Sequence, residues 1–100
     1  MKKQEEMVQR QEAMRRKTAE HEAELTVLRE QRHKMRAHHG TMVKDMGARL
    51  SAKFGERAQD DIDEQVQRAE TEHADRMQMI DLAIREVEER LARVRRELGN

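Results

Sequence analysis

Eight residues in the C-terminal third of the chain recur at alternating spacings of four and three, the a/d pattern of a coiled coil. They form two stripes, Met77, Ile84, Leu91 and Leu98 in one and His73, Ile80, Val87 and Val94 in the other. The pattern predicts a helix over about 60–98 that buries one narrow seam against another helix. Asp60 is a suitable N-cap for this helix, and Gly99 is a suitable residue to end it.

The composition excludes a compact globular core. Of the 100 residues 42% are charged and 1% are aromatic, and the chain has no proline, cysteine, tryptophan or tyrosine. A seam between helices needs only about two apolar residues in seven, which this composition supplies. Because good helix formers such as Glu, Arg, Ala, Met and Gln are abundant, we expect an all-α coiled coil of long helices and not a disordered chain.

The N-terminal third carries a seam with fewer apolar residues. One stripe recurs every seven residues and consists of Met7, Met14, His21, Leu28, Met35 and Met42. Its companion stripe is mostly polar and consists of Gln4, Gln11, Thr18, Leu25 and Arg32. The pattern predicts a helix over about 2–38, ended by Gly40.

Glycines punctuate the middle of the chain at positions 40, 47 and 55, and each weakens a helix interior by about 1 kcal/mol relative to alanine. We therefore expect three segments: an N-terminal helix over 1–39, a corner over 40–59 and a C-terminal helix over 60–100. The corner would hold a short amphipathic helix with an apolar face of Val43, Met46, Leu50 and Phe54. One continuous helix through this region is the alternative.

The two parts of the chain carry opposite charge. Residues 1–58 hold fourteen basic and nine acidic residues, whereas residues 59–100 hold seven and twelve. An antiparallel hairpin folded about Gly47 would set these parts against each other. It would also place His21 beside His73 and Met14 near Ile80. A two-stranded hairpin buries little, so we expect an oligomer or a protein partner to complete the core.

Residues that carry catalysis or bind cofactors are sparse. The sequence has no cysteine, a single serine, no HExxH motif and no glycine-rich phosphate loop, so we expect no enzyme activity, metal or cofactor. The adjacent His38 and His39 would point about 100° apart on a helix, which suits a cationic helix end better than a metal site.

The net charge of zero argues against a nucleic-acid binder. The absence of a long apolar run or a targeting pattern predicts a soluble, intracellular protein. Contact of the amphipathic segment over 42–54 with a membrane surface is the least favoured alternative.

Two groups remain as candidate sites. If His21 and His73 face each other on the seam, protonation of both near pH 6 would loosen the helical pair. The alternative is that each ring lies at the edge of the seam and is partly wet. The apolar face over Val43–Phe54 is either the corner's own packing or a docking face.

The stretch KKQEEMVQRQEAMRRKTAEHEAEL, residues 2–25, resembles the N-terminal coiled coil of the mitochondrial ATPase family AAA-domain-containing protein three. The resemblance implies an oligomerising coiled coil and a mitochondrial location. It covers about a quarter of the chain, and the family's ATPase domain and membrane helix have no counterpart in this sequence. A second stretch, FGERAQDD at 54–61, is similar to the start of the ATP synthase inhibitor protein, although the aromatic residue that follows in that family is missing.

Two functions follow from these patterns. The first is a non-catalytic structural or interaction module, in which the coiled coil mediates self-association or docks within a larger assembly. The second is a helical regulatory inhibitor of an enzyme. It would act through the central segment around Phe54, with the coiled coil setting the oligomeric state.

Overall fold

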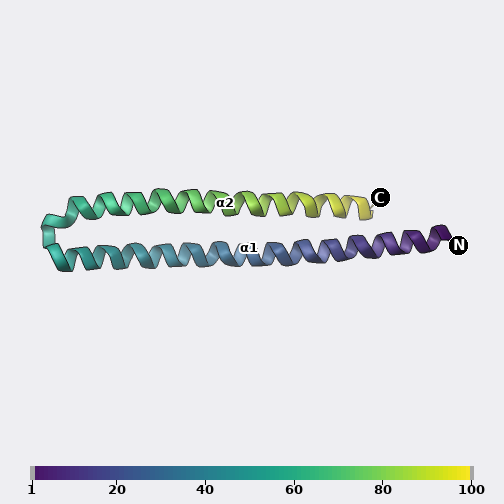
Figure 1. Cartoon of the computed structure of the whole chain (residues 1–100), viewed down its shortest axis with the longest axis horizontal. Helices are drawn as coiled ribbons and strands as arrows, with labels where there is room; N and C mark the ends of the chain where they lie inside the picture. The colour runs from purple at the N-terminus through teal and green to yellow at the C-terminus, as the bar shows by residue number, and fades with distance from the viewer. Residues whose placement is uncertain (1, 100) are drawn as a thin grey trace. The chain divides into compact units, whose positions relative to one another are not determined.

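The described part of the chain is entirely helical. The computed structural model describes residues 2–99, apart from the side chain of Ala58. Helix α1 spans Lys2–Phe54, a short 3-10 helix η1 spans Gly55–Ala58, and helix α2 spans Gln59–Gly99 (Figure 1). The prediction of an all-α chain of long helices is confirmed, and α2 begins within one residue of its predicted start.

The chain divides into two compact units. Residues up to 30 and residues from 82 onward form one, which we call the terminal unit; Gln31–Asp81 form the other, the hairpin unit. In each unit a segment of α1 packs antiparallel to a segment of α2 (Figure 1).

The predicted corner over 40–59 is wrong in its N-terminal part, because α1 runs without a break through Gly40 and Gly47 to Phe54. The glycine penalty of about 1 kcal/mol each is local. It is offset by the contacts of the same helical turns, since Met46 and Leu50 are half-buried in the hairpin unit. No separate central helix forms.

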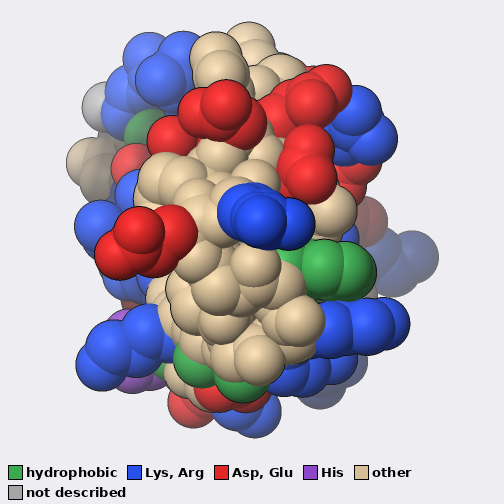
Figure 2. Space-filling model, turned by 90° about the vertical axis from the view of Figure 1, so that its left-hand side faces the viewer, with side chains coloured by type: hydrophobic (Ala, Val, Ile, Leu, Met, Phe, Trp, Pro, Cys, Tyr) green, Lys and Arg blue, Asp and Glu red, His purple; other side chains and the backbone are tan. Residues whose placement is uncertain are grey.

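The chain reverses at Gly55, whose φ of +64° is the one positive φ among the described residues. An L-residue in this left-handed conformation loses about 1–2 kcal/mol, a penalty that glycine avoids. Gly55 therefore ends α1, and Asp60 and Asp61 place negative charge in the first turn of α2, where the helix dipole favours it. Seen from this end, the molecule shows backbone and uncharged side chains at its centre, acidic and basic side chains around them, and small areas of hydrophobic side chain (Figure 2).

Moving the reversal from Gly47 to Gly55 changes every partner across the hairpin. His73 stacks on His39, and His21 belongs to the terminal unit, where it shares a cavity with Val94. Met14 shares a cavity with Leu98. The predicted neighbours His21–His73 and Met14–Ile80 are therefore wrong, because each residue of α1 meets a position closer to the C-terminus of α2.

The predicted stripes of α2 do form its packed face. Ile80, Ile84, Val87 and Leu91 are buried, and Met77, Val94, Leu98 and His73 are half-buried. On α1 the predicted stripe is half-buried at Met14, His21, Leu28, Met35 and Met42. Met7 differs, with 62% of its surface exposed, so the packed part of this stripe starts one heptad later than predicted.

In the terminal unit two ion pairs bracket the core. Nη2 of Arg95 donates a 2.7 Å hydrogen bond to Oε1 of Glu22, and Nη2 of Arg29 lies 4.0 Å from Oε1 of Glu88. Leu25 lies between Glu22 and Arg29 on α1 and is buried, which agrees with the antiparallel register that the two ion pairs define.

In the hairpin unit the seam of α2 departs from the heptad. Its packed residues Val66, Ala69, His73 and Met77 are spaced three, four and four apart, an 11-residue step. Such a step locally unwinds a left-handed coil. The sequence places a histidine inside this irregular step.

Candidate functional site

The feature that most distinguishes this seam from an ordinary coiled coil is a cluster of histidines in the hairpin unit. A cavity of about 330 Å³ lies between the helices and is lined by Met35, His38, His39, Met42, His73 and Arg76. The α1 members occupy positions i, i+3, i+4 and i+7, so they share one face of that helix. Arg76 and His73 complete the lining from α2.

His39 and His73 meet face to face across the seam. Their ring centroids are 3.8 Å apart and their planes differ by 5°. Aromatic side chains usually pair with centroids about 4.5–7 Å apart. The two imidazoles are thus in close stacking contact, and each comes from a different helix.

His39 is enclosed but poorly partnered. Its side chain is 11% exposed, and neither ring nitrogen has a hydrogen-bond partner among the described residues. Nε2 lies 3.2 Å from Oε1 of Glu70, a distance at which a protonated ring would form an ion pair, although the two atoms are not aligned as a hydrogen bond. The carboxylate of Glu70 is therefore placed to attract a proton on His39.

The surroundings lower the pKa of His73. Desolvation is the largest cause, and the charge of the neighbouring His39 is the second. Glu70 opposes them and raises the pKa, whereas Arg76 and Arg36 lower it further. The folded hairpin unit therefore favours a neutral His73.

Sequence reasoning missed His39 as a seam residue, although a signal was present. Position 39 is the next heptad step after Arg32 in the polar companion stripe of α1. Because the predicted helix ended at residue 38, position 39 was not counted as a member of this stripe. His38, its neighbour, is exposed at the edge of the cavity, as its position on the helix requires.

The predicted docking face is divided. Val43, Met46 and Leu50 are half-buried, whereas Phe54 keeps 53% of its surface exposed next to the turn. Nζ of Lys53 lies 5.3 Å from the centroid of the Phe54 ring, a cation–π distance. Only the last residue of the predicted face thus remains largely open to a partner.

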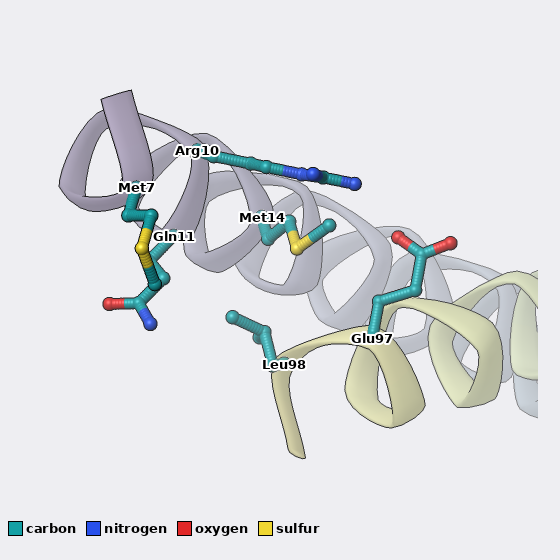
Figure 3. A pocket seen from close by; sticks show the side chains of 6 residues that line it. All are labelled: Met7, Arg10, Gln11, Met14, Glu97 and Leu98. Carbon is teal, nitrogen blue, oxygen red and sulfur yellow. The ribbon is translucent and has the colours of Figure 1, made fainter. Parts of the chain in front are cut away.

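The terminal unit has its own cavities. One, of about 390 Å³, lies where α1 passes the end of α2 and is lined by Met7, Arg10, Gln11, Met14, Glu97 and Leu98. Figure 3 shows Met14 and Leu98 pointing into the gap between the helices. His21 lines another together with Lys17 and Arg90. Both are open grooves along the seam of the terminal unit.

Within residues 2–99 there is no cluster of three or more His, Asp or Glu side chains placed to hold a metal ion. Across the same residues, neither helix has a stretch apolar and long enough to cross a membrane.

No protein-family profile matches the chain, and no curated protein or solved structure gives a significant match. The resemblance of residues 2–25 to the mitochondrial ATPase family, and that of residues 54–61 to the ATP synthase inhibitor protein, stay predictions.

Proposed function

We propose that the chain is a non-catalytic coiled-coil module that mediates self-association or docks within a larger assembly. The observation that carries this proposal is the imbalance of the core. Helix α2 contributes Ile62, Ala69, Ile80, Ile84, Val87 and Leu91 as buried residues, while Leu25 is the buried residue of the described part of α1.

The remaining seam of α1 is covered only in part. Met14, Leu28 and Met35 are half-buried, and Val8 and Val27 stand exposed on other faces of the helix. Two helices alone bury a limited share of their apolar surface, and bundles reach a complete core by adding helices. A second copy or a partner helix laid along α1 would cover part of this apolar surface.

Ion pairs support a defined antiparallel register. Glu22–Arg95 and Arg29–Glu88 connect the helices in the terminal unit, and Arg32–Asp81 connects them in the hairpin unit. Exposed pairs contribute at most about 1 kcal/mol each, so they select orientation more than they stabilise. A fixed register is what an interaction module needs to present a constant surface.

Light scattering after size exclusion tests the proposal. We expect a mass at least twice the 11.9 kDa of one chain, which falls on dilution. Replacing the exposed Val8 and Val27 by glutamine should weaken the assembly while circular dichroism stays helical. The matched control is Thr26→Gln, an exposed polar position on the same helix. A monomer at all concentrations that melts cooperatively would show that the core is complete in one chain, and it would overturn the proposal.

A second candidate function is enzyme inhibition through the turn. The exposure of Phe54 beside Gly55 supports it, because an aromatic residue at a hairpin tip is available for insertion into another protein. The test is ATP hydrolysis by isolated ATP synthase with wild-type chain and with Phe54→Ala. Inhibition that Phe54→Ala abolishes would favour this function, and the absence of inhibition by the wild type would exclude it for that enzyme.

A further inference from the structure

The hairpin unit brings ionisable rings from both helices into contact at the centre of its seam. His39 comes from α1 and His73 from α2, and their centroids are 3.8 Å apart. The other titratable or charged groups that face this pair are His38 and Arg36 on α1 and Glu70 and Arg76 on α2. Every protonation change here acts directly on a contact between the helices.

The charges around the pair compensate one proton but not two. A proton on His39 would be attracted by the carboxylate of Glu70, 3.2 Å from Nε2. A second proton on His73 would place two cations in stacking contact, close to Arg76 and with the carboxylate of Glu70 as the neighbouring negative charge. Like charges at this separation repel strongly wherever water is partly excluded.

The packing near the pair is weak enough for this repulsion to matter. The residues next to it on the seam are Met35, Met42 and Met77, all half-buried, and the small Ala69. The spacing of α2 over residues 66–77 also departs from the heptad. Segments with few buried apolar contacts open at lower free energy than the rest of a protein.

We propose that His39 and His73 form an acid-sensitive latch, which holds the two helices of the hairpin unit together near neutral pH and releases them in mild acid. Release would expose Met35 and Met42, whose flexible side chains adapt to different apolar partners. The latch itself depends only on the geometry of the hairpin unit, while its effect on assembly rests on the proposed function.

Hydrogen exchange of the full chain, measured by mass spectrometry at pH 7.5 and pH 5 and corrected for the intrinsic rates, tests the latch. We expect protection over residues 32–46 and 62–80 to fall by about tenfold, because two like charges in stacking contact oppose the closed arrangement of the helices. Protection over residues 18–28 and 84–96 should stay within about threefold of its neutral value. An equal loss of protection in both units would overturn the proposal.

Variants separate the latch from general acid effects. His73→Phe keeps a stacking ring and removes the charge, so the pH dependence in the hairpin unit should disappear. The double variant His39→Gln/His73→Gln should behave in the same way. The control is His21→Gln, a seam histidine of the terminal unit, which should keep the wild-type response. A wild-type response in both latch variants would overturn the proposal.

Light scattering on the same samples reports association separately. Loss of protection in a chain that stays monomeric would support the latch and contradict self-association. A stable oligomer whose protection is the same at both pH values would support self-association and contradict the latch.

Discussion

The side chain of Arg32 donates a hydrogen bond of 2.6 Å from Nε to Oδ1 of Asp81, from a seam position that coiled coils normally fill with an apolar residue. Both side chains are more than a third exposed, so little desolvation opposes the pair. A polar residue at a seam position specifies register at a cost in stability. The pair thus fixes how α1 and α2 align in the hairpin unit.

Arg32→Leu should stabilise the hairpin unit. Leucine would add apolar burial on the seam, and the exposed Asp81 would lose a partner that contributes little. We expect the free energy of unfolding in urea to rise by about 1 kcal/mol. Asp81→Asn, the matched control, should change it by less than about 0.5 kcal/mol. A clear loss of stability in Arg32→Leu would mean that the ion pair stabilises more than its exposure indicates.

The glycines should differ in the sign of their response. An added Cβ meets no atom within 4 Å at Gly47 or Gly55, so only the backbone conformation matters. Gly55→Ala should destabilise by about 1–2 kcal/mol because of its positive φ. Gly47→Ala should stabilise by about 0.5–1 kcal/mol, since it lies inside α1. Thermal melts of the two variants decide this, and equal effects would place the turn elsewhere.

Leu25 should be the most sensitive position of α1. Leu25→Ala removes a buried side chain and should cost about 2–4 kcal/mol. Glu24→Ala, one residue away and exposed, should change stability by less than about 0.5 kcal/mol. Urea titrations followed by circular dichroism measure both. Similar costs at the two positions would contradict the assigned packing of the terminal unit.

Stability should decline in mild acid. The ordinary pKa of histidine is about 6.5, and the pKa of His73 in the folded chain is lower. Below pH 6.5 the unfolded chain therefore binds more protons than the folded one, so the free energy of unfolding falls as the pH decreases towards the folded pKa. Well above pH 6.5, where neither state holds this proton, the contribution is constant.

Glu70→Gln should make that decline larger. Glu70 raises the pKa of His73, so its removal makes proton binding by the folded chain less favourable. We expect unchanged stability near pH 8 and a greater loss than wild type at pH 5.5, measured by urea titration. Glu64→Gln is the matched control, because Glu64 is an exposed carboxylate of the same helix paired with Arg68 over 3.4 Å, and neither residue lines the cavity. A loss no greater than that of wild type would remove Glu70 from the latch.

The apolar pattern of α2 was predictable from sequence, because Ile80, Ile84, Val87 and Leu91 repeat at the helix period and all are buried. The position of the turn was not. Glycines 40, 47 and 55 have the same intrinsic helix propensity, and what separates Gly55 from the others is the backbone conformation that packing imposes on it. The partners across the hairpin follow from the turn, and so the pairing of His73 with His39 required the structure.

The reversal at Gly55 also sets an order for folding. Arg32 and Asp81 are 49 residues apart along the chain, and Glu22 and Arg95 are 73 apart. Extending the closed loop from the first contact to the second adds only about 0.4 kcal/mol of entropy loss. Once the segments nearest the turn have met, each further layer forms with almost no additional closure penalty. We expect the folding transition state to contain the seam next to Gly55. Kinetic φ-values, which compare the effect of a mutation on the folding rate with its effect on stability, should therefore decline from Leu50 towards Leu25. The turn glycine thus controls the rate at which the chain folds as well as its final register.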